Sequence, residues 1–179
     1  AGDGCGLSAH KFSSGSYTEG RLAAKAAVNF AYDFPNEPNI DGASVEQIQR
    51  DIWAPLLRFE EHRHATTRDD INPNYLLHKQ ALHRLQKIMD EYAGGWGSGY
   101  MTNEPTLNRG LEHMKMLTED FSQFGARDLH ELLRCWEVVH RAQCGETHMR
   151  HLLHRKETRW PGYYYRGDFP GLDDENWKL

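Results

Sequence analysis

The sequence predicts a mainly α-helical chain, in which a glycine-rich loop and one helix precede a four-helix bundle-like domain. Apolar residues recur at steps of three and four through most of the chain, which is the spacing of one face of an α-helix. Clusters of glycine and proline separate these stretches, and none of them alternates apolar and polar residues as a strand does. We place a domain boundary near residue 42, so that residues 1–42 end one domain and residues 43–179 form the helical one.

The first predicted helix covers residues 17–33. Residues 1–16 are rich in Gly and Ser, as loops are, whereas the residues that follow are rich in Ala, the strongest helix former. Ser16 fits the N-cap of this helix, and Glu19 lies at the position that completes a capping box. Two prolines and a final glycine in residues 34–42 predict a linker.

The next predicted helices follow this linker. One begins with Ser44 as its N-cap and Gln47 at the capping-box position, and Pro55 should kink or split it. Another has Asn72 as its N-cap and Pro73 as its first helical residue. Their apolar positions are Val45, Ile48, Ile52, Leu56 and Phe59 in the first, and Leu77, Ala81, Leu85, Ile88 and Tyr92 in the second.

Two further helices complete the predicted bundle. The glycine run 94–99 before them is expected to be a flexible connection, and the last helix begins near Asp128 and runs towards Arg155. Their apolar positions are Leu107, Leu111, Met114, Leu117 and Phe121, and then Leu129, Leu132, Leu133, Trp136 and Val139. Amphipathic helices joined by short connections are typical of a bundle. The aromatic tail that follows is expected to lie extended over another part of the protein.

Composition excludes several classes of protein. The 179 residues include 21 Lys and Arg against 26 Asp and Glu, and a net charge of -5 disfavours binding to nucleic acid or to an anionic membrane. No apolar run is long enough for a transmembrane span. Three cysteines without a CxxC pair fit neither a disulfide framework nor a zinc ribbon. We therefore expect a soluble, cytoplasmic protein, and the glycine-rich start without an initiator Met suggests a fragment.

The glycine-rich opening is the first candidate site, and its residues are Gly2, Asp3, Gly4, Ser14, Gly15 and Ser16. Asp3 can accept hydrogen bonds from the hydroxyls of a cofactor, and the backbone N–H groups of residues 14–16 can face an electron-rich atom. An ordinary capped helix after a loop explains Ser16 and Glu19 equally well without a ligand.

A polar stripe on the last helix is the second candidate. His140, Cys144, His148 and His151 are metal-ligand types on one face. His140 and His148 lie about 12 Å apart along a helix axis, so one ion cannot bind all four side chains. We expect no metal site and interpret the stripe as a partly buried or interface surface.

The closing segment 157–166 is the third candidate, because it combines two arginines with four aromatic rings. Such residues can bind a nucleotide by charge and stacking, and they also anchor protein interfaces. The residue types favour docking over nucleotide binding.

The two ends of the chain resemble a known family. Residues 1–4 with His10-Lys11-Phe12-Ser13-Ser14-Gly15-Ser16 and 19–21 are similar to the second FAD-binding segment of the fumarate reductase/succinate dehydrogenase flavoproteins. The version here resembles the α subunits of adenylylsulfate (APS) reductases, and residues 157–166 and 173–177 resemble the C-terminal helical region of those subunits. The dicarboxylate enzymes of the superfamily carry an H-G-A-N-R run whose arginine binds a substrate carboxylate. Here no arginine appears between His10 and Arg21, which disfavours a dicarboxylate substrate.

The resemblance implies a function for the longer polypeptide. It implies that residues 1–42 are the remnant of an FAD-binding α/β domain, and that the enzyme interconverts adenylylsulfate with AMP and sulfite by two-electron chemistry at FAD. An iron-sulfur β subunit, which alone carries the iron-sulfur clusters, is the implied partner. The catalytic residues are unknown and are expected outside this chain, so the isolated fragment should be inactive. Two alternatives remain open, another flavoprotein of the superfamily and a non-catalytic helical binding module. The direction of the reaction in the cell also remains open.

Overall fold

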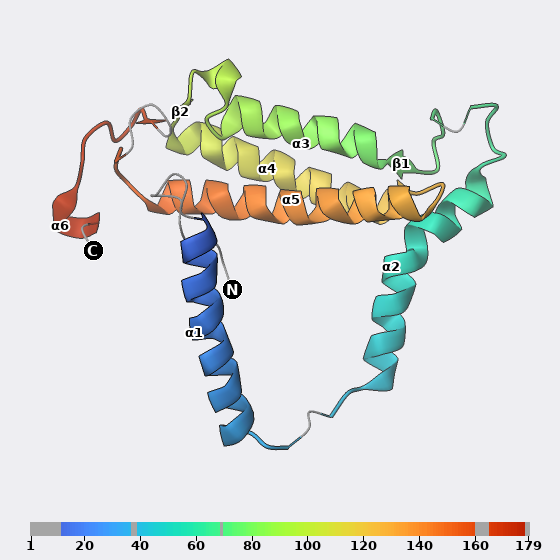
Figure 1. Ribbon diagram of the computed structural model, residues 1–179. Helices are drawn as coiled ribbons and strands as arrows, with labels where there is room; N and C mark the ends of the chain where they lie inside the picture. Colours follow the sequence, from blue (N-terminus) through green and yellow to red (C-terminus); the bar gives the residue numbers. More distant parts are fainter. Residues whose placement is uncertain (1–11, 37–38, 69, 160–164, 178–179) are drawn as a thin grey trace. The chain divides into compact units, whose positions relative to one another are not determined.

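The computed structural model describes residues 12–36, 39–68, 70–159 and 165–177 (Figure 1). The chain divides into two compact units, Ala1–Val45 and Glu46–Leu179. Within the described part of the chain, no helix is long and apolar enough to cross a membrane. The prediction of a mainly helical protein is confirmed.

The first unit contains helix α1, Phe12–Asp33. The predicted helix exists, but the prediction that Ser16 is its N-cap is wrong, because the helix begins four residues earlier. Ser13, Ser14 and Ser16 are all capping residue types, and local sequence does not decide among them. At the other end, the rings of Phe30 and Phe34 lie 4.8 Å apart.

Helix α2, Gly42–His62, begins with Asp41 as its capping residue. The Asp41 carboxylate accepts hydrogen bonds from the amides of Ala43 (3.2 Å) and Ser44 (3.1 Å) and from the Ser44 hydroxyl (2.6 Å). The predicted cap at Ser44 is therefore wrong, because the hydroxyl of Ser44 donates to the capping carboxylate.

Helix α2 continues through Pro55 and joins the second unit there. Proline donates no helical hydrogen bond, and this part of α2 bonds instead to neighbouring segments. Nε1 of Trp136 donates to the carbonyl of Ile52 (3.2 Å), and the amide of Ala126 donates to the carbonyl of Pro55 (3.0 Å). Arg58 Nη1 donates to the carbonyl of Phe124 (2.8 Å). Three hydrogen bonds therefore fasten α2 at its proline.

The core of the second unit lies between α3 (His78–Tyr92), α4 (Glu104–Asp120) and α5 (Leu129–His154), which pack side by side (Figure 1). Its most buried residues include Ala81, Leu107, Met114, Leu117, Ala126 and Met149, all at 0% exposure. Asn103 and Asp128 cap α4 and α5 by accepting hydrogen bonds from the amides of Thr106 (2.9 Å) and Glu131 (2.8 Å). The predicted start of the last helix near Asp128 is confirmed.

Helix α3 begins at His78, so the prediction that Asn72 caps it is wrong. Asn72 instead forms a turn, in which its side-chain oxygen accepts a hydrogen bond from the amide of Asn74 (3.0 Å). Its Nδ2 donates to the carbonyl of His62 at the end of α2 (2.8 Å). Asparagine favours both arrangements, and the contact with His62 decides between them.

Four two-residue strands connect the helices. Strand β1 (Leu76–Leu77) pairs in parallel with β3 (Phe124–Gly125), and β2 (Met101–Thr102) pairs in parallel with β4 (Tyr165–Arg166). The sequence predicted no strand, because two residues are too few to show an alternating pattern. The chain also forms two short 3-10 helices, η1 (Trp96–Ser98) and η2 (Phe121–Gln123), and a last helix, α6 (Asp174–Trp177).

Candidate functional site

The predicted cofactor-binding residues lie at the start of the chain. Gly2, Asp3 and Gly4 lie outside the described residues, whereas Ser14, Gly15 and Ser16 lie in the first five residues of α1. The first amides of a helix have no intrahelical acceptor. In a helix that begins at Phe12 this group includes the amide of Ser14, and the amides of Gly15 and Ser16 belong to the helical ladder. The arrangement leaves one of the three predicted amides free of the helical ladder.

The polar stripe runs along α5. Cys144, His140 and His151 are exposed, and His148 is half-buried. Burial and then the neighbouring His151 lower the pKa of His148. Nδ1 of His151 lies 2.8 Å from the carbonyl of Thr147 in the same helix. The described residues contain no group of three or more His, Cys, Asp or Glu side chains that could hold a metal ion.

The closing segment is organised around Glu157, whose side chain has 0% exposure. Its carboxylate accepts hydrogen bonds from Arg155 Nε (2.7 Å), from Arg159 Nε (2.8 Å) and Nη2 (2.9 Å), and from the amide of Asp173 (3.0 Å). The hydrogen bonds from Arg159 contribute most to lowering the pKa of Glu157, which falls to about 2. Arg159 Nη2 also donates to Asp174 at the start of α6 (2.8 Å).

Arg166 is the second centre of this segment, with 1% of its surface exposed. Its Nε and Nη2 each lie 2.9 Å from an oxygen of Asp168. Nη1 donates to the carbonyl of Leu152 and, at 3.0 Å, to the carbonyl of Arg155. The last carbonyls of a helix lack intrahelical donors, so Arg166 satisfies the C-terminus of α5.

Both arginines of the closing segment are therefore paired with carboxylates of the chain itself. This pairing favours the docking interpretation over nucleotide binding, because each guanidinium already has an anionic partner. Residues 160–164, which include three of the four aromatic rings, lie outside the described residues. The fourth ring belongs to Tyr165 in strand β4, where the chain is extended against β2 as predicted.

A buried polar cluster escaped the sequence analysis. His78, Glu131 and Cys135 have 8%, 6% and 1% exposure, and Nδ1 of His78 has no hydrogen-bond partner among the described residues. Burial opposes ionisation of Glu131, but hydrogen bonds from the side chain and backbone of Arg127 outweigh it and lower the pKa of Glu131. Burial, and then the charge of Glu131, raises the pKa of the Cys135 thiol to about 12. The i,i+4 spacing of Glu131 and Cys135 was the only sequence signal.

Two surface grooves lie on the second unit. One, of about 430 Å³, separates the C-terminal half of α2 from α4 and α5, and Pro55, Phe121, Trp136 and Val139 contribute to its lining. The other, of about 660 Å³, lies between α4 and α5 and is lined mostly by polar and charged side chains, including Glu112, Lys115, Glu146 and Arg150. Neither groove contains a residue predicted to bind the cofactor.

Similar proteins agree on the kind of polypeptide to which this chain is related. A curated relative, the adenylylsulfate reductase subunit alpha of Megalodesulfovibrio gigas, is 44% identical over 176 residues, which are 98% of this chain and 26% of that protein. The solved structure of adenylylsulfate reductase from Archaeoglobus fulgidus is 56% identical, with a TM-score of 0.88 over 94% of this chain and 26% of that one. A structure of adenosine-5-phosphosulfate reductase with a covalent sulfite adduct is 57% identical, with a TM-score of 0.89 and the same coverage.

A more distant structure, the Sdh1 complex of Mycobacterium smegmatis in its apo form, shares the fold alone. It is 18% identical, with a TM-score of 0.59 over 82% of this chain and 22% of that one. This chain thus spans about a quarter of the length of the relatives that it matches.

The family comparison covers the second unit. Residues 82–179 match the family described as the fumarate reductase flavoprotein C-terminus. This match contains α4, α5 and most of α3, the helices that form the core. The resemblance inferred from the two ends of the sequence is confirmed, and the chain belongs to the fumarate reductase flavoprotein C-terminal family.

Proposed function

We propose that this chain is part of the α subunit of an adenylylsulfate reductase, which interconverts adenylylsulfate with AMP and sulfite. The observation that carries this proposal is the 44% identity over 98% of the chain with a protein named as that subunit. The two reductase structures at 56% and 57% identity support the same proposal, since such likeness extends over 94% of this chain.

Residues 1–42 are, in this proposal, the last piece of the FAD-binding domain. The support is the apolar character of α1. Leu22 (61% exposed), Val28 (68%), Phe30 (65%) and Tyr32 (86%) lie on different sides of the helix. A helix that is apolar all round is normally buried in a larger domain. The rest of that domain belongs, in the proposal, to the three quarters of the relatives' length that this chain does not span.

The start of the chain contributes to cofactor binding in this proposal. FAD supplies the two-electron redox chemistry when it is bound. The first turn of α1 presents the amide of Ser14 and the positive end of the helix dipole, which stabilise negative charge on the ring by about 0.3–2 kcal/mol. Asp3 would accept hydrogen bonds from the hydroxyls of the cofactor. Gly2 and Gly4 would let the backbone approach it closely, and Gly15 and Ser16 would support the turn that carries Ser14.

Residues 43–179 act as a packing domain in this proposal. They would cover part of the FAD-binding domain, and the proposed cytoplasmic enzyme would receive electrons through an iron-sulfur β subunit. The grooves and buried clusters of the second unit contain no group that we assign to catalysis. The catalytic residues then belong to other parts of the polypeptide, and the isolated 179-residue chain should have no reductase activity.

Proline at Ser14 tests the proposed role of the first turn. In the full-length polypeptide, Ser14→Pro removes one N–H group in a turn where proline is tolerated. The matched control, Ser14→Ala, keeps the amide and removes only the hydroxyl. We expect Ser14→Pro alone to lower the flavin content and the formation of the sulfite adduct, both measured by absorbance. Equal values in the two variants would remove this role, and a wild-type polypeptide without flavin absorbance would overturn the proposed function.

A further inference from the structure

The connection between α3 and α4 is a hydrogen-bonded turn, and the prediction of a flexible linker there is wrong. Asp90 Oδ1 accepts a hydrogen bond from the amide of Gly97 (3.0 Å), and the Asp90 carbonyl accepts one from Gly95 (3.2 Å). The carbonyl of Gly95 in turn accepts hydrogen bonds from the amides of Ser98 (3.2 Å) and Tyr100 (3.0 Å). We call residues 94–101 the Trp96 turn.

The glycines of the Trp96 turn have geometric reasons. A Cβ atom on Gly95 would lie 2.4 Å from Cα of Asp90, and one on Gly97 would lie 2.6 Å from Oδ2 of Asp90. Gly94 and Gly99 have φ values of 81° and 62°, in the left-handed region that glycine adopts easily. Tyr100 adopts a φ of 61° without being glycine. The glycine-rich sequence therefore specifies one backbone conformation here.

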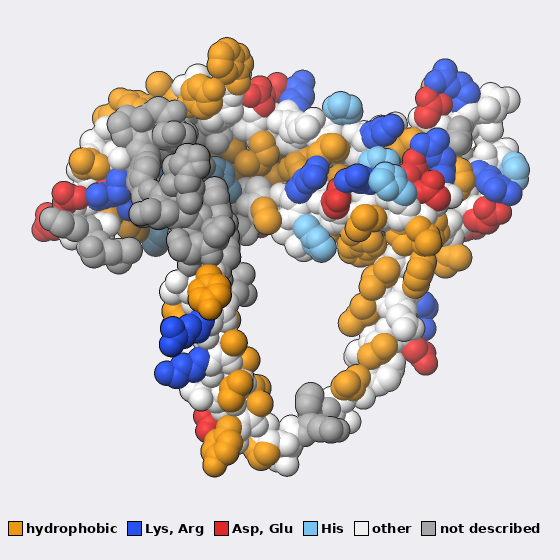
Figure 2. Space-filling view, viewed as in Figure 1, with side chains coloured by type: hydrophobic (Ala, Val, Ile, Leu, Met, Phe, Trp, Pro, Cys, Tyr) orange, Lys and Arg blue, Asp and Glu red, His pale blue; other side chains and the backbone are white. Residues whose placement is uncertain are grey.

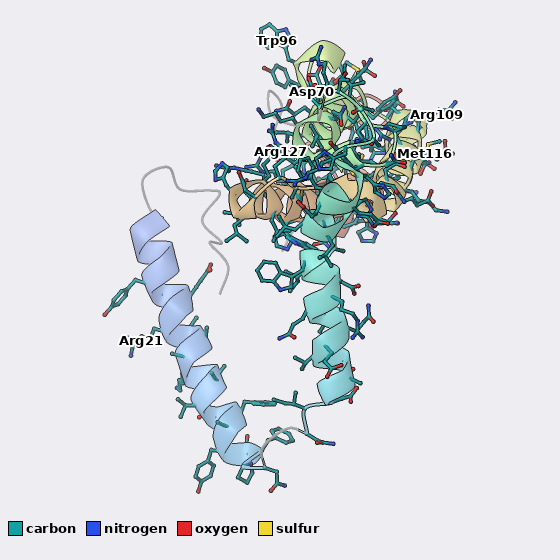
Figure 3. All side chains as sticks on the ribbon, turned by 90° about the vertical axis from the view of Figure 1, so that its right-hand side faces the viewer. Arg21, Asp70, Trp96, Arg109, Met116 and Arg127 are labelled. Atoms are coloured by element: carbon teal, nitrogen blue, oxygen red, sulfur yellow. The ribbon has the colours of Figure 1, made fainter. Side chains whose placement is uncertain are left out.

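This conformation displays an aromatic side chain. Trp96 is 81% exposed, and its neighbours Tyr100 and Met101 are 42% and 48% exposed. The rings of Trp96 and Tyr100 meet edge to face with their centroids 6.1 Å apart. Figure 3 shows the Trp96 side chain at the margin of the second unit, pointing away from the helices. Large aromatic side chains held in a fixed position are typical anchors of protein interfaces.

The charge around this anchor has one sign. Residues 88–108 contain Asp90, Glu91 and Glu104 and no Lys, Arg or His. Glu91 and Glu104 are exposed. A partner that covers Trp96 would bring its own side chains close to these carboxylates, and basic side chains would complement them.

We propose that the Trp96 turn is a contact surface for the second subunit of the enzyme, and that Trp96 enters an apolar pocket rimmed by Lys or Arg on that subunit. The proposal rests on the proposed function, since the Megalodesulfovibrio gigas relative is named as one subunit of such an enzyme. The projecting anchor and its acidic surroundings favour a separate chain, because complementary charge steers the association of two chains.

The test uses the full-length polypeptide with and without its copurifying second subunit. Hydroxyl-radical footprinting measures the oxidation of Trp96 in both samples, and a binding titration compares wild type with Trp96→Ala. We expect Trp96 to be oxidised in the free polypeptide and protected in the complex. Trp96→Ala should weaken association about tenfold or more. The control, Met116→Ala, removes a side chain that is 55% exposed on another part of the surface (Figure 3) and should leave affinity unchanged.

Flavin content and reductase activity are measured on the same samples to separate the two proposals. Protection of Trp96 already in the free polypeptide would overturn the contact, because another part of the same chain would then cover it. Equal oxidation in both samples, or unchanged affinity of Trp96→Ala, would also overturn the contact, and normal flavin and activity would leave the proposed function standing. A wild-type enzyme without flavin would end both proposals.

Discussion

Arg166 and Asp168 form a bidentate ion pair, in which two guanidinium nitrogens each lie 2.9 Å from a carboxylate oxygen. The same carboxylate accepts a hydrogen bond from the amide of Glu104 (2.8 Å), and the same guanidinium donates to carbonyls at the end of α5. The pair therefore joins the C-terminal segment to the end of α5 and to the start of α4. Two residues of the tail thus satisfy backbone groups at two helix ends.

Replacing the buried arginine should destabilise the second unit. In Arg166→Met, Asp168 loses its partner and the last carbonyls of α5 lose their donor. We expect the free energy of unfolding to fall by about 3 kcal/mol, which is typical of breaking a buried pair. The control is Arg109→Met, because the pair of Arg109 with Glu112 is exposed and should contribute less than about 1 kcal/mol. Urea unfolding of this chain followed by circular dichroism measures both, and equal losses would contradict the prediction.

Glu157 should make stability depend on pH at the acidic end. Hydrogen bonds from Arg159 hold its pKa at about 2 in the folded protein, below the value of 4.5 for an ordinary glutamate. The stabilisation is therefore complete above pH 4.5 and is lost as the pH falls towards 2. Glu157→Gln should be less stable at pH 7 and should lose less stability than wild type on acidification. Melting temperatures between pH 7 and pH 2 give the two slopes, and Glu112→Gln controls for the loss of one negative charge.

Close packing of α4 should make Gly110 intolerant of a methyl group. A Cβ atom there would lie 2.7 Å from Cβ of Tyr92 and 2.8 Å from Sδ of Met149. Alanine favours a helix by about 1 kcal/mol over glycine, but overpacking of a core costs about 1–3 kcal/mol. We expect a net loss of stability in Gly110→Ala. Gly20→Ala in α1, where nothing lies within 4 Å, should cause none. Thermal unfolding of both variants tests the difference, and a more stable Gly110→Ala would refute it.

Cysteine reactivity should separate the core from the surface. Cys135 has 1% exposure, and burial raises its pKa to about 12, whereas Cys144 is exposed. The thiolate is the reactive form, so Cys135 should resist alkylation at pH 8 in the folded chain. In a Cys5→Ser background, iodoacetamide followed by mass spectrometry should label Cys144 first. Cys135 should react at a comparable rate only in guanidinium chloride, and equally rapid labelling in the folded chain would disprove this packing.

The exposed apolar face of α2 shows where helical periodicity succeeds and where it stops. Ile48, Ile52, Leu56 and Phe59 follow one helical stripe, as the sequence predicted. Phe59 is 8% exposed in the second unit, whereas Ile48 is 58% exposed, and Figure 2 shows hydrophobic side chains along this helix. Periodicity identifies the face of a helix that will be covered, but it does not identify the surface that covers it.

Local signals predicted the helical fold and most of its elements, because steps of three and four and caps such as Asp128 depend only on neighbouring residues. The same signals placed the starts of α1, α2 and α3 wrongly, since several residues near each start can serve as caps. Of the candidate site, the sequence could supply residue types and a resemblance, and the roles of Gly2, Asp3, Gly4, Ser14, Gly15 and Ser16 remain predictions.

The amino-acid sequence by itself determined the helical class of this protein, the faces of its helices and its likeness to a flavoprotein family. Only the tertiary structure decided the partners of Glu157 and Arg166, the burial of His78 beside Glu131 and the rigid display of Trp96. The physical reason is the range of the interactions. Helix periodicity acts within a few residues, whereas the pairing of Arg166 with the end of α5 depends on how distant segments meet.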